Sequence, residues 1–341
     1  MLGIETSCDD TAVSLVDGRG RVRSSVVSSQ LKAHQPYGGV VPEIASREHL
    51  RNWPPVIETA LVEAEAQWSQ IAGVAVTSAP GLVGSLLVGL SLGRAISLGR
   101  QIPFYAVHHL HGHLLSPFLD ADGGPATSPP NEFVGLVVSG GHTALYRLVD
   151  GEIETLGTTR DDAMGEAFDK VGKRLGFDYP QGPRVDEVAE TGDPQSFAFT
   201  LPKCAETLDF SYSGLKTQAV QHWQNLERSQ PSGQGVDGRL VADLLAGFRH
   251  AAVAQILDRL TELHGSSPFQ HLAVSGGAAA NRLLRRQLAT WSTQAGIDLS
   301  LVPLTFSGDN AAMIAHAAIQ RALRGDHDDP LVVEASSRAA L

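Results

Sequence analysis

The sequence predicts an α/β protein of two lobes. Its 341 residues exceed one ordinary domain, and 43% of them are hydrophobic, which is enough to build two packed cores. Residues 2–18 (LGIETSCDDTAVSLVDG) and 134–151 (VGLVVSGGHTALYRLVDG) share a strand–turn–strand pattern. We interpret this repeat as an internal duplication, with one β-hairpin in each lobe and a central cleft between the lobes. A chance likeness of two short hairpins is the alternative.

The elements of the first lobe follow its hairpin in a regular order. A Gly/Pro loop becomes an amphipathic helix within 34–64, and a strand at 72–77 leads through a Gly-rich turn into an apolar helix at 78–100. Glycines and Arg94 interrupt the apolar stretch 81–98, which predicts a buried helix and not a membrane span. Residues 120–132 have the composition of a linker. We therefore expect an N-terminal lobe at 1–120, completed by a helix from 307–325, a C-terminal lobe at 130–306 and a tail at 326–341.

The second lobe contains two further patterns of interest. Asp162, Glu166, Asp169 and Lys173 fall at helical steps, as on a solvated helix face or at a binding site. Residues 271–288 predict a strand, a double-glycine turn and a helix, in which Asn281 lies one turn into the helix. Gly276 and Gly277 would let a base or a ribose lie against bare backbone. Residues 229–238 are expected to be a disordered insert.

Overall composition excludes several classes of protein. The two cysteines, Cys8 and Cys204, cannot form a disulfide framework, and the sequence shows neither a signal peptide nor a membrane span. We expect a cytoplasmic location and no membrane partner. The net charge of −11 argues against tight, unaided binding of nucleic acid.

A histidine-rich segment, HHLHGH at 108–113, is the strongest chemical signal. If it is helical, His109 and His113 lie on one face with Cβ atoms about 6 Å apart, a spacing that suits two ligands of one metal ion. Asp309, in FSGDNAAM between a strand-like run at 299–306 and a helix, is the candidate third ligand. Two imidazoles and one carboxylate leave coordination positions open for substrate. The alternative is a histidine-rich turn with no ligand role.

Eight motifs together resemble one family. They are GIETSCDDT, PGLVGSLLVG, HHLHGH, VVSGGHT, DDAMGEAFDK, DYPQGP, SGGAAANRLLR and SGDNAAM, and they extend from residue 2 to about 325. This pattern resembles the tRNA N6-adenosine threonylcarbamoyltransferases, formerly described as O-sialoglycoprotein endopeptidases. The resemblance implies the two-lobed fold of actin, Hsp70 and sugar kinases. It also implies transfer of threonylcarbamoyl from threonylcarbamoyl-adenylate to N6 of adenosine 37, 3′ of the anticodon, in tRNAs that read codons beginning with A, with release of AMP.

The resemblance implies roles for individual residues. One divalent metal per chain, most commonly Fe²⁺ with Zn²⁺ as the alternative, would be held by His109, His113 and Asp309. Substrate would be bound by Val137, Val138, Ser139, Gly140, Gly141, Asp169, Gly182, Asp186 and Asn281. Asp9 would orient the adenine amine or accept its proton. The chain departs from the family at His111, where Glu is common, and at Gln181, where Gly is common.

Partners and rival functions complete the expectations. The resemblance implies tRNA, a paralogous noncatalytic subunit and a small ATPase subunit as partners. A local basic surface for tRNA would consist of Lys170, Lys173, Arg174, Arg282, Arg285 and Arg286, which are otherwise solvated helix faces. A metallopeptidase is the first rival, but Leu110 stands where a zincin has its catalytic Glu. A kinase or ATPase of the same fold would not need the His-His-Asp set, and a noncatalytic scaffold paralogue would be expected to lack these histidines.

Overall fold

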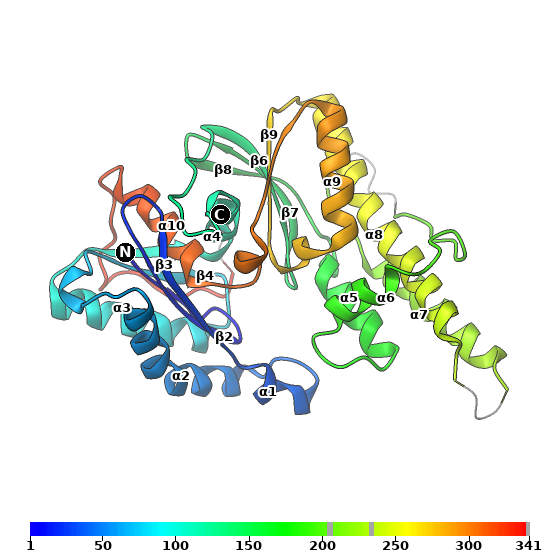
Figure 1. Ribbon diagram of the computed structural model, residues 1–341, viewed down its shortest axis with the longest axis horizontal. Coiled ribbons are helices and arrows are strands. Elements are labelled where there is room, and N and C mark those ends of the chain that lie inside the picture. Colours follow the sequence, from blue (N-terminus) through cyan, green and yellow to red (C-terminus); the bar gives the residue numbers. More distant parts are fainter. Residues whose placement is uncertain (203–206, 232–234, 339–341) are drawn as a thin grey trace. The chain divides into compact units, whose positions relative to one another are not determined.

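The computed structural model describes residues 1–202, 207–231 and 235–338. Cys204, the centre of the segment 229–238 that was expected to be a disordered insert, and the last three residues of the predicted tail lie outside these ranges. The chain divides into two compact units, Met1–Pro129 with Val302–Leu341, and Pro130–Leu301. Each unit is built on a five-stranded sheet (Figure 1).

The sheet of the first unit has the strand order β3-β2-β1-β4-β5. Its strands are β1 (Leu2–Glu5), β2 (Asp10–Val16), β3 (Val22–Ser29), β4 (Val74–Ala79) and β5 (Phe104–His108). The first three are antiparallel, whereas β4 and β5 run parallel to β1. Leu2, Ile4, Val74 and Val76 are fully buried, as expected for central strands covered on both faces.

Five α-helices accompany this sheet in the described part of the unit. They are α1 (Leu31–His34), α2 (Pro42–Glu63), α3 (Val83–Arg100), α4 (His109–Leu115) and α10 (Ala311–Ala322), with short 3-10 turns at Gln35–Tyr37, Trp68–Gln70, Ser116–Phe118 and Leu304–Phe306. The alanine-rich helix α10 packs on β1, β2 and α4. A Cβ at Gly3 would lie 2.2 Å from the carbonyl oxygen of Ala311, so glycine is what lets α10 lie this close to β1. The start of α10 is thereby fixed against the sheet.

The second unit repeats this topology, with the strand order β10-β9-β6-β7-β8. Strands β6 (Glu132–Val138), β7 (Thr143–Val149) and β8 (Glu152–Thr158) are antiparallel, and β9 (His271–Ser275) and β10 (Asp298–Leu301) continue in parallel from β6. Hairpins β1–β2 and β6–β7 are the two that the duplicated sequence pattern predicts. That part of the predicted fold is confirmed, and the cleft between the lobes stays a prediction.

The helices described in the second unit are α5 (Met164–Arg174), α6 (Gln181–Ala189), α7 (Ser213–Ser229), α8 (Gly238–Ser266) and α9 (Arg282–Ala295), with a 3-10 turn at Gly277–Ala280. Among the described residues, α8 is the one helix long and apolar enough to cross a membrane, but 72% of its apolar window is buried inside the protein. Burial of this kind is typical of a core helix.

One predicted strand is shorter than expected. The strand-like run at 299–306 forms β10 only as far as Leu301, and a 3-10 turn follows at Leu304–Phe306. Pro303 lacks the amide hydrogen that a strand ladder requires, so the strand ends before it. The turn that follows leads to Asp309.

Candidate functional site

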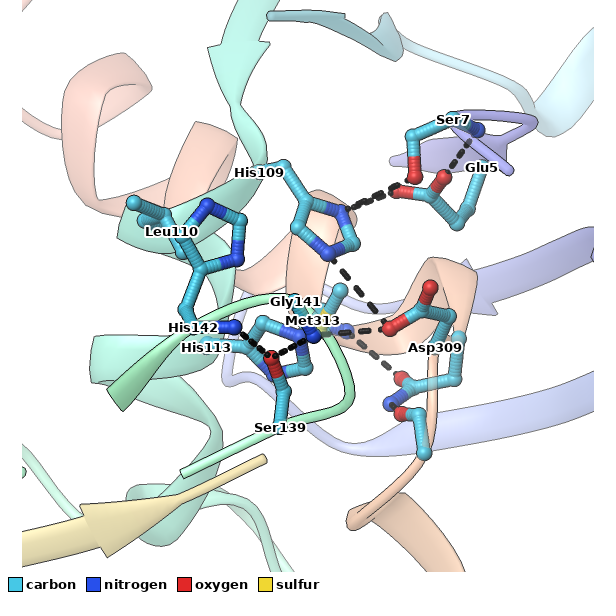
Figure 2. Close-up of polar contacts among 12 residues, drawn as sticks. Glu5, Ser7, His109, Leu110, His113, Ser139, Gly141, His142, Asp309 and Met313 are labelled. Carbon is cyan, nitrogen blue, oxygen red and sulfur yellow. Dashed lines mark hydrogen bonds and ion pairs between the residues drawn. The ribbon is translucent and has the colours of Figure 1, made fainter. Parts of the chain in front are cut away.

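Two histidines of α4 and a carboxylate from a distant turn form a compact cluster in the first unit. His109 and His113 are four residues apart on one helix face, and their ring centroids lie 4.6 Å apart. Nε2 of His109 is 3.4 Å from Asp309 Oδ1, and Nε2 of His113 is 3.2 Å from the same oxygen (Figure 2). The three ligand atoms lie within 4.8 Å of one another. The sequence-predicted set is therefore brought together.

The turn that carries Asp309 is held by its neighbour Asn310. The Asn310 side chain accepts a hydrogen bond from Met313 N at 3.0 Å as the N-cap of α10. Its amide nitrogen donates to the carbonyl oxygens of Phe306 and Gly308 at 3.0 and 2.9 Å. The Asp309 carboxylate is thus fixed at the start of a buried helix, while 30% of its side chain stays exposed.

Glu5, at the end of β1, orients the first histidine. Nδ1 of His109 lies 3.0 Å from Glu5 Oε2 and 3.3 Å from Ser7 Oγ (Figure 2). Thr77 donates to the same Glu5 oxygen at 2.6 Å, and the Ser7 amide donates to the other one. A carboxylate that accepts a hydrogen bond from Nδ1–H leaves Nε2 directed at Asp309, the arrangement found behind many metal-bound imidazoles.

Electrostatics make this cluster a site for a cation. Burial lowers the pKa of His109, but the charges of Asp309 and Glu5 outweigh burial and raise that pKa well above its usual range. Burial raises the pKa of Asp309, but the His109 charge opposes it and holds that pKa well below its usual range. Burial also lowers the pKa of His113. The directions of these pKa shifts give two ionised carboxylates, a neutral His113 and a His109 that carries an extra proton, and a metal cation bound at Nε2 of His109 would replace that proton.

The spacing of the ligand atoms fits one metal ion. Two ligands each about 2.1 Å from a metal, at angles of about 90° to 110°, lie roughly 3.0–3.4 Å apart. The separations of 3.4 and 3.2 Å between the histidine nitrogens and Asp309 agree with that range. Nε2 of His113 faces Asp309 at 3.2 Å without a well-aligned hydrogen bond, and its Nδ1 is buried without a hydrogen-bond partner among the described residues. A buried nitrogen of this kind is suited to coordination.

A separate cavity of about 430 Å³ lies in the second unit. Its walls come from the β6–β7 turn, α5, the start of α6 and the turn before α9. The lining residues are Gly140, Met164, Gly165, Phe168, Asp169, Pro180, Gly182, Pro183, Asp186, Gly277, Ala278, Ala280, Asn281 and Arg282. Its size and its mixture of apolar and glycine surface with a few polar groups are typical of a small-molecule site.

Asp186 organises the polar wall of this cavity. Its Oδ1 accepts hydrogen bonds from Asn281 Nδ2 at 2.8 Å and from Arg249 Nη1 at 2.9 Å, and its Oδ2 accepts from the backbone of Arg282 at 3.2 Å. On the opposite helix, Asp169 accepts from the backbone of Gly182 at 2.7 Å, and burial raises the pKa of Asp169.

Comparison with known proteins places the chain in a family. Residues 21–316 match the family model of the tRNA N6-adenosine threonylcarbamoyltransferases. Enzymes of that name from Pelobacter propionicus and Magnetococcus marinus are 47% and 44% identical to it. The first alignment covers 92% of this chain and 90% of the relative, and the second 96% and 93%. The chain belongs to this family.

Solved structures agree on the fold. HypF from T. kodakarensis superposes with a TM-score of 0.59 at 13% identity, over 95% of this chain and 47% of that one. Component A of the Acidaminococcus fermentans (R)-2-hydroxyglutaryl-CoA dehydratase gives 0.52 at 13% identity, over 95% and 98%. The two-lobed α/β fold of the actin, Hsp70 and sugar-kinase class, predicted from the sequence, is confirmed.

Five of the residues predicted to bind substrate line the cavity, and four do not. Gly140, Asp169, Gly182, Asp186 and Asn281 line it. Val137 and Val138 are fully buried in β6, and Ser139 Oγ accepts the amides of Gly141 and His142 at 3.3 and 3.0 Å, which closes the hairpin turn (Figure 2). The amides of residues 141 and 142 are therefore already occupied within the turn.

The position of Asn281 differs from the prediction. A 3-10 turn at Gly277–Ala280 intervenes after β9, so Asn281 is the N-cap of α9, where its Oδ1 accepts from Leu284 N at 2.9 Å. Gly276 precedes this turn with φ of +94°, and a Cβ there would lie 2.3 Å from the Val138 carbonyl oxygen. The double glycine thus serves backbone packing at residue 276 and cavity lining at residue 277.

The two positions at which this chain departs from the family pattern, His111 and Gln181, do not disrupt the histidine–aspartate cluster or the cavity. His111 lies outside the three-residue cluster, and burial lowers its pKa to about 4. Gln181 is buried at the start of α6, where its amide donates to Phe177 O at 3.5 Å, and Gly182 still reaches Asp169. Sequence reasoning did not single out Glu5, Arg249 or the apolar walls Met164 and Phe168. Three of these four residues lie within the family motifs: Glu5 in GIETSCDDT, and Met164 and Phe168 in DDAMGEAFDK.

Asp9 lies in the half-buried turn between β1 and β2, which begins just after Glu5. Its carbonyl oxygen accepts from the backbone of Gln30 at 3.0 Å. Its carboxylate is not one of the clustered ligand atoms.

Proposed function

We propose that this chain transfers the threonylcarbamoyl group of threonylcarbamoyl-adenylate to N6 of adenosine 37 in tRNAs reading codons that begin with A, and that AMP leaves. The observation that carries the proposal is the family match over residues 21–316, in a chain that keeps both the His-His-Asp cluster and the cavity. In the reaction a bond forms between N6 and the carbamoyl carbon, the bond from that carbon to the phosphate oxygen breaks, and N6 loses one proton.

The cluster would hold one divalent metal through His109, His113 and Asp309. Two imidazoles and one carboxylate with open positions are typical of iron(II), which we propose as the ion, with zinc(II) as the alternative. A metal at this site would supply electrostatic stabilisation to oxygens of the threonylcarbamoyl group. Glu5 would keep His109 in the tautomer that presents Nε2.

Other residues of the chain would position the reactants. Gly140, Asp169, Gly182, Asp186 and Asn281 would hold the adenylate in the cavity of the second unit, with Val137, Val138, Ser139 and Gly141 shaping the hairpin turn beside Gly140. Asp9 would orient the adenine amine or accept its proton. Positioning of this kind is worth about 7–11 kcal/mol of barrier, and the proposed arrangement relies mainly on it.

Partners are part of the proposal. We propose tRNA as substrate and a paralogous noncatalytic subunit and a small ATPase as associated proteins in the cytoplasm. Helices α2 and α3 pack on one another and expose the apolar side chains of Leu50, Val62, Val83 and Leu87 by 45–76%. Apolar side chains left exposed in this way favour a protein contact on these helices. The predicted N- and C-terminal lobes would correspond to the two compact units.

Nucleoside mass spectrometry of tRNA incubated with threonylcarbamoyl-adenylate and the chain, with and without candidate partners, tests the activity. His109→Ala and Asp309→Ala should lose both bound metal and product, whereas the matched variant His111→Ala should retain both. Unchanged metal content in the first two variants would refute the metal assignment. Absence of modified nucleoside under every condition would refute the transferase, and cleavage of a glycoprotein instead would favour the peptidase.

A further inference from the structure

A hydrogen-bonded network of buried polar side chains lies next to the β1–β2 turn that carries Asp9. It consists of His34, Gln30, His49 and Thr11, which are 0–3% exposed. All four lie in the first unit, on elements that surround the turn, and none of them lines the cavity or belongs to the metal cluster. A fully buried set of two imidazoles, an amide and a hydroxyl is costly unless every group is satisfied, so its hydrogen bonds define what it does.

The donor and acceptor roles in this network are set at His34. The backbone amide of Val41 donates to His34 Nδ1 at 3.2 Å, so this nitrogen must be the unprotonated one. Nε2 therefore carries the proton and donates to Gln30 Oε1 at 3.1 Å. With its oxygen engaged there, Gln30 directs its amide nitrogen to the Ala45 carbonyl at 3.3 Å and to His49 Nδ1 at 3.2 Å.

The hydrogen bonds of His49 fix its tautomer in the same way. Its Nδ1 receives the Gln30 amide and lies 2.8 Å from Thr11 Oγ1, so it accepts from both. Nε2 must then carry the proton, and it donates to the Cys8 carbonyl oxygen at 3.0 Å. Burial lowers the pKa of His49, in agreement with a neutral ring. Protonation of Nδ1 would remove the hydrogen bond from the Gln30 side chain and reverse the one with Thr11.

The contacts of His49 bracket the acidic pair of the turn. It binds the backbone of residue 8 on one side of Asp9 and Asp10 and the side chain of residue 11 on the other. The backbone of Gln30 adds a hydrogen bond to the Asp9 carbonyl at 3.0 Å. Helix α2 anchors His49 because Ala45, Val56, Ile57 and Ala60 of that helix are buried against the sheet. The turn is therefore tied to a rigid helix by one imidazole.

We propose that His49 is a positioning residue, held in its Nε2–H tautomer by Gln30 and His34, that fixes the Asp9 turn for the transfer reaction. This inference rests on the proposed function, because it matters to catalysis only if Asp9 acts on the transferred group. It predicts that loss of the imidazole lowers kcat by about 100-fold, the effect of a small misplacement of a reacting group, and leaves the KM for threonylcarbamoyl-adenylate within about twofold.

Three variants separate positioning from general stability. His49→Phe keeps the ring shape and removes both contacts, His49→Gln keeps a donor for the Cys8 carbonyl, and Val56→Ala weakens the packing of the same helix without touching the turn. We expect kcat to fall about 100-fold in His49→Phe and about tenfold in His49→Gln, and to stay near the wild-type value in Val56→Ala. Bound metal should be unchanged in all three. Equal kcat in His49→Phe and Val56→Ala would overturn the inference.

A second readout does not depend on activity. The backbone N–H of Gln30 donates to the Asp9 carbonyl oxygen, so the hydrogen exchange of this backbone amide reports the position of the turn. We expect this amide to exchange about tenfold faster in His49→Phe than in Val56→Ala, as for the loss of one hydrogen bond. If His49→Phe does not fold, Gln30→Glu, which replaces the donor to His49 with an acceptor, takes its place in both measurements. An inactive wild-type enzyme would refute the proposed function, and unchanged exchange would separately refute the positioning role.

Discussion

Replacement of Arg249 tests how the cavity wall is built. Arg249 lies on α8, is 5% exposed, and donates to Asp186 Oδ1 at 2.9 Å and to Glu190 Oε2 at 2.7 Å. It also donates to the carbonyl oxygens of Asp186 and Ala189 at 3.0 and 3.1 Å, two groups at the end of α6. Arg249→Met keeps an unbranched apolar side chain and removes every donor.

The expected cost is about 3 kcal/mol in the free energy of unfolding. Removal of one partner of a buried ion pair costs about 3–5 kcal/mol, because the other charge remains buried. Asp186, with 12% of its side chain exposed, keeps its bonds from Asn281 and Arg282, which favours the lower end. Glu190 is one-third exposed and keeps Arg286 at 2.7 Å, so it adds little. A loss of this size is a large part of an ordinary stability of roughly 5–15 kcal/mol.

A double variant tests the cause. In Arg249→Met/Asp186→Asn no unpaired charge is left in the wall, so the total loss should shrink to about 1 kcal/mol. Urea unfolding followed by tryptophan fluorescence gives the stability, and calorimetry gives the affinity for AMP. Arg239→Met, on the same helix but with a cation that is 63% exposed, is the control. Its buried partner Asp243 keeps the backbone amide of Asp193 as a donor, so the stability should change by less than about 1 kcal/mol. Strictly additive losses in the double variant, or a loss in Arg249→Met no larger than in the control, would refute the reasoning.

Three further predictions concern binding and pH. Asn281→Ala and Asp169→Ala should each weaken AMP binding by about 0.5–3 kcal/mol, and calorimetry that finds wild-type affinity in both would contradict the cavity assignment. Burial lowers the pKa of His316 from 6.5 to about 4, so the unfolded chain binds more protons between these values, and stability should fall as the pH is lowered through that window. His316→Leu should flatten this dependence by up to roughly 3 kcal/mol in urea titrations, and equal slopes would show that His316 is not its source. Binding of tRNA by the isolated chain should be weak and should fall steeply with salt in fluorescence anisotropy, and partners should raise the affinity at physiological salt, whereas tight, salt-resistant binding by the lone chain would remove the need for partners.

The clustering of the three candidate metal ligands could be predicted because their signals are local. His109 and His113 are one helical turn apart, and Asp309 begins a turn before an alanine-rich helix. The role of Glu5 could not be predicted in the same way. The orientation of the Glu5 carboxylate depends on the pairing of β1 with β4. This pairing brings the Thr77 hydroxyl to Oε2 of Glu5, the oxygen that His109 also contacts. Contacts across a parallel sheet join residues that are 72 apart in the chain, and no spacing rule encodes them.

The cavity was predicted in part for a related reason. The sequence indicates which turns carry glycine, and Gly140, Gly182 and Gly277 do line the cavity. It does not indicate which side chains of a strand remain accessible. The side chains of Val137 and Val138 are fully buried in β6, and the substrate-binding role that the resemblance implies for these residues stays a prediction. Arg249 was not singled out because its partners lie 59–63 residues away, on a helix that packs beside α8 only in the folded chain.

The predicted basic surface shows how far charge depends on tertiary pairing. Of its six cations, Lys170 lies 2.5 Å from Asp162 and 2.9 Å from Glu166, Arg174 lies 3.5 Å from Glu227, and Arg286 lies 2.7 Å from Glu190. The acidic partners Glu227 and Glu190 come from distant segments, so the sequence pattern could not reveal them. A cation that is paired with a carboxylate must give up that ion pair before it can bind a phosphate. It therefore contributes less to the free energy of tRNA binding than an unpaired cation would. In a chain of net charge −11, at least these three of the six cations are thus already offset. We therefore expect stable tRNA binding to draw positive charge from outside this chain, which is the physical reason for the partners in the proposed function.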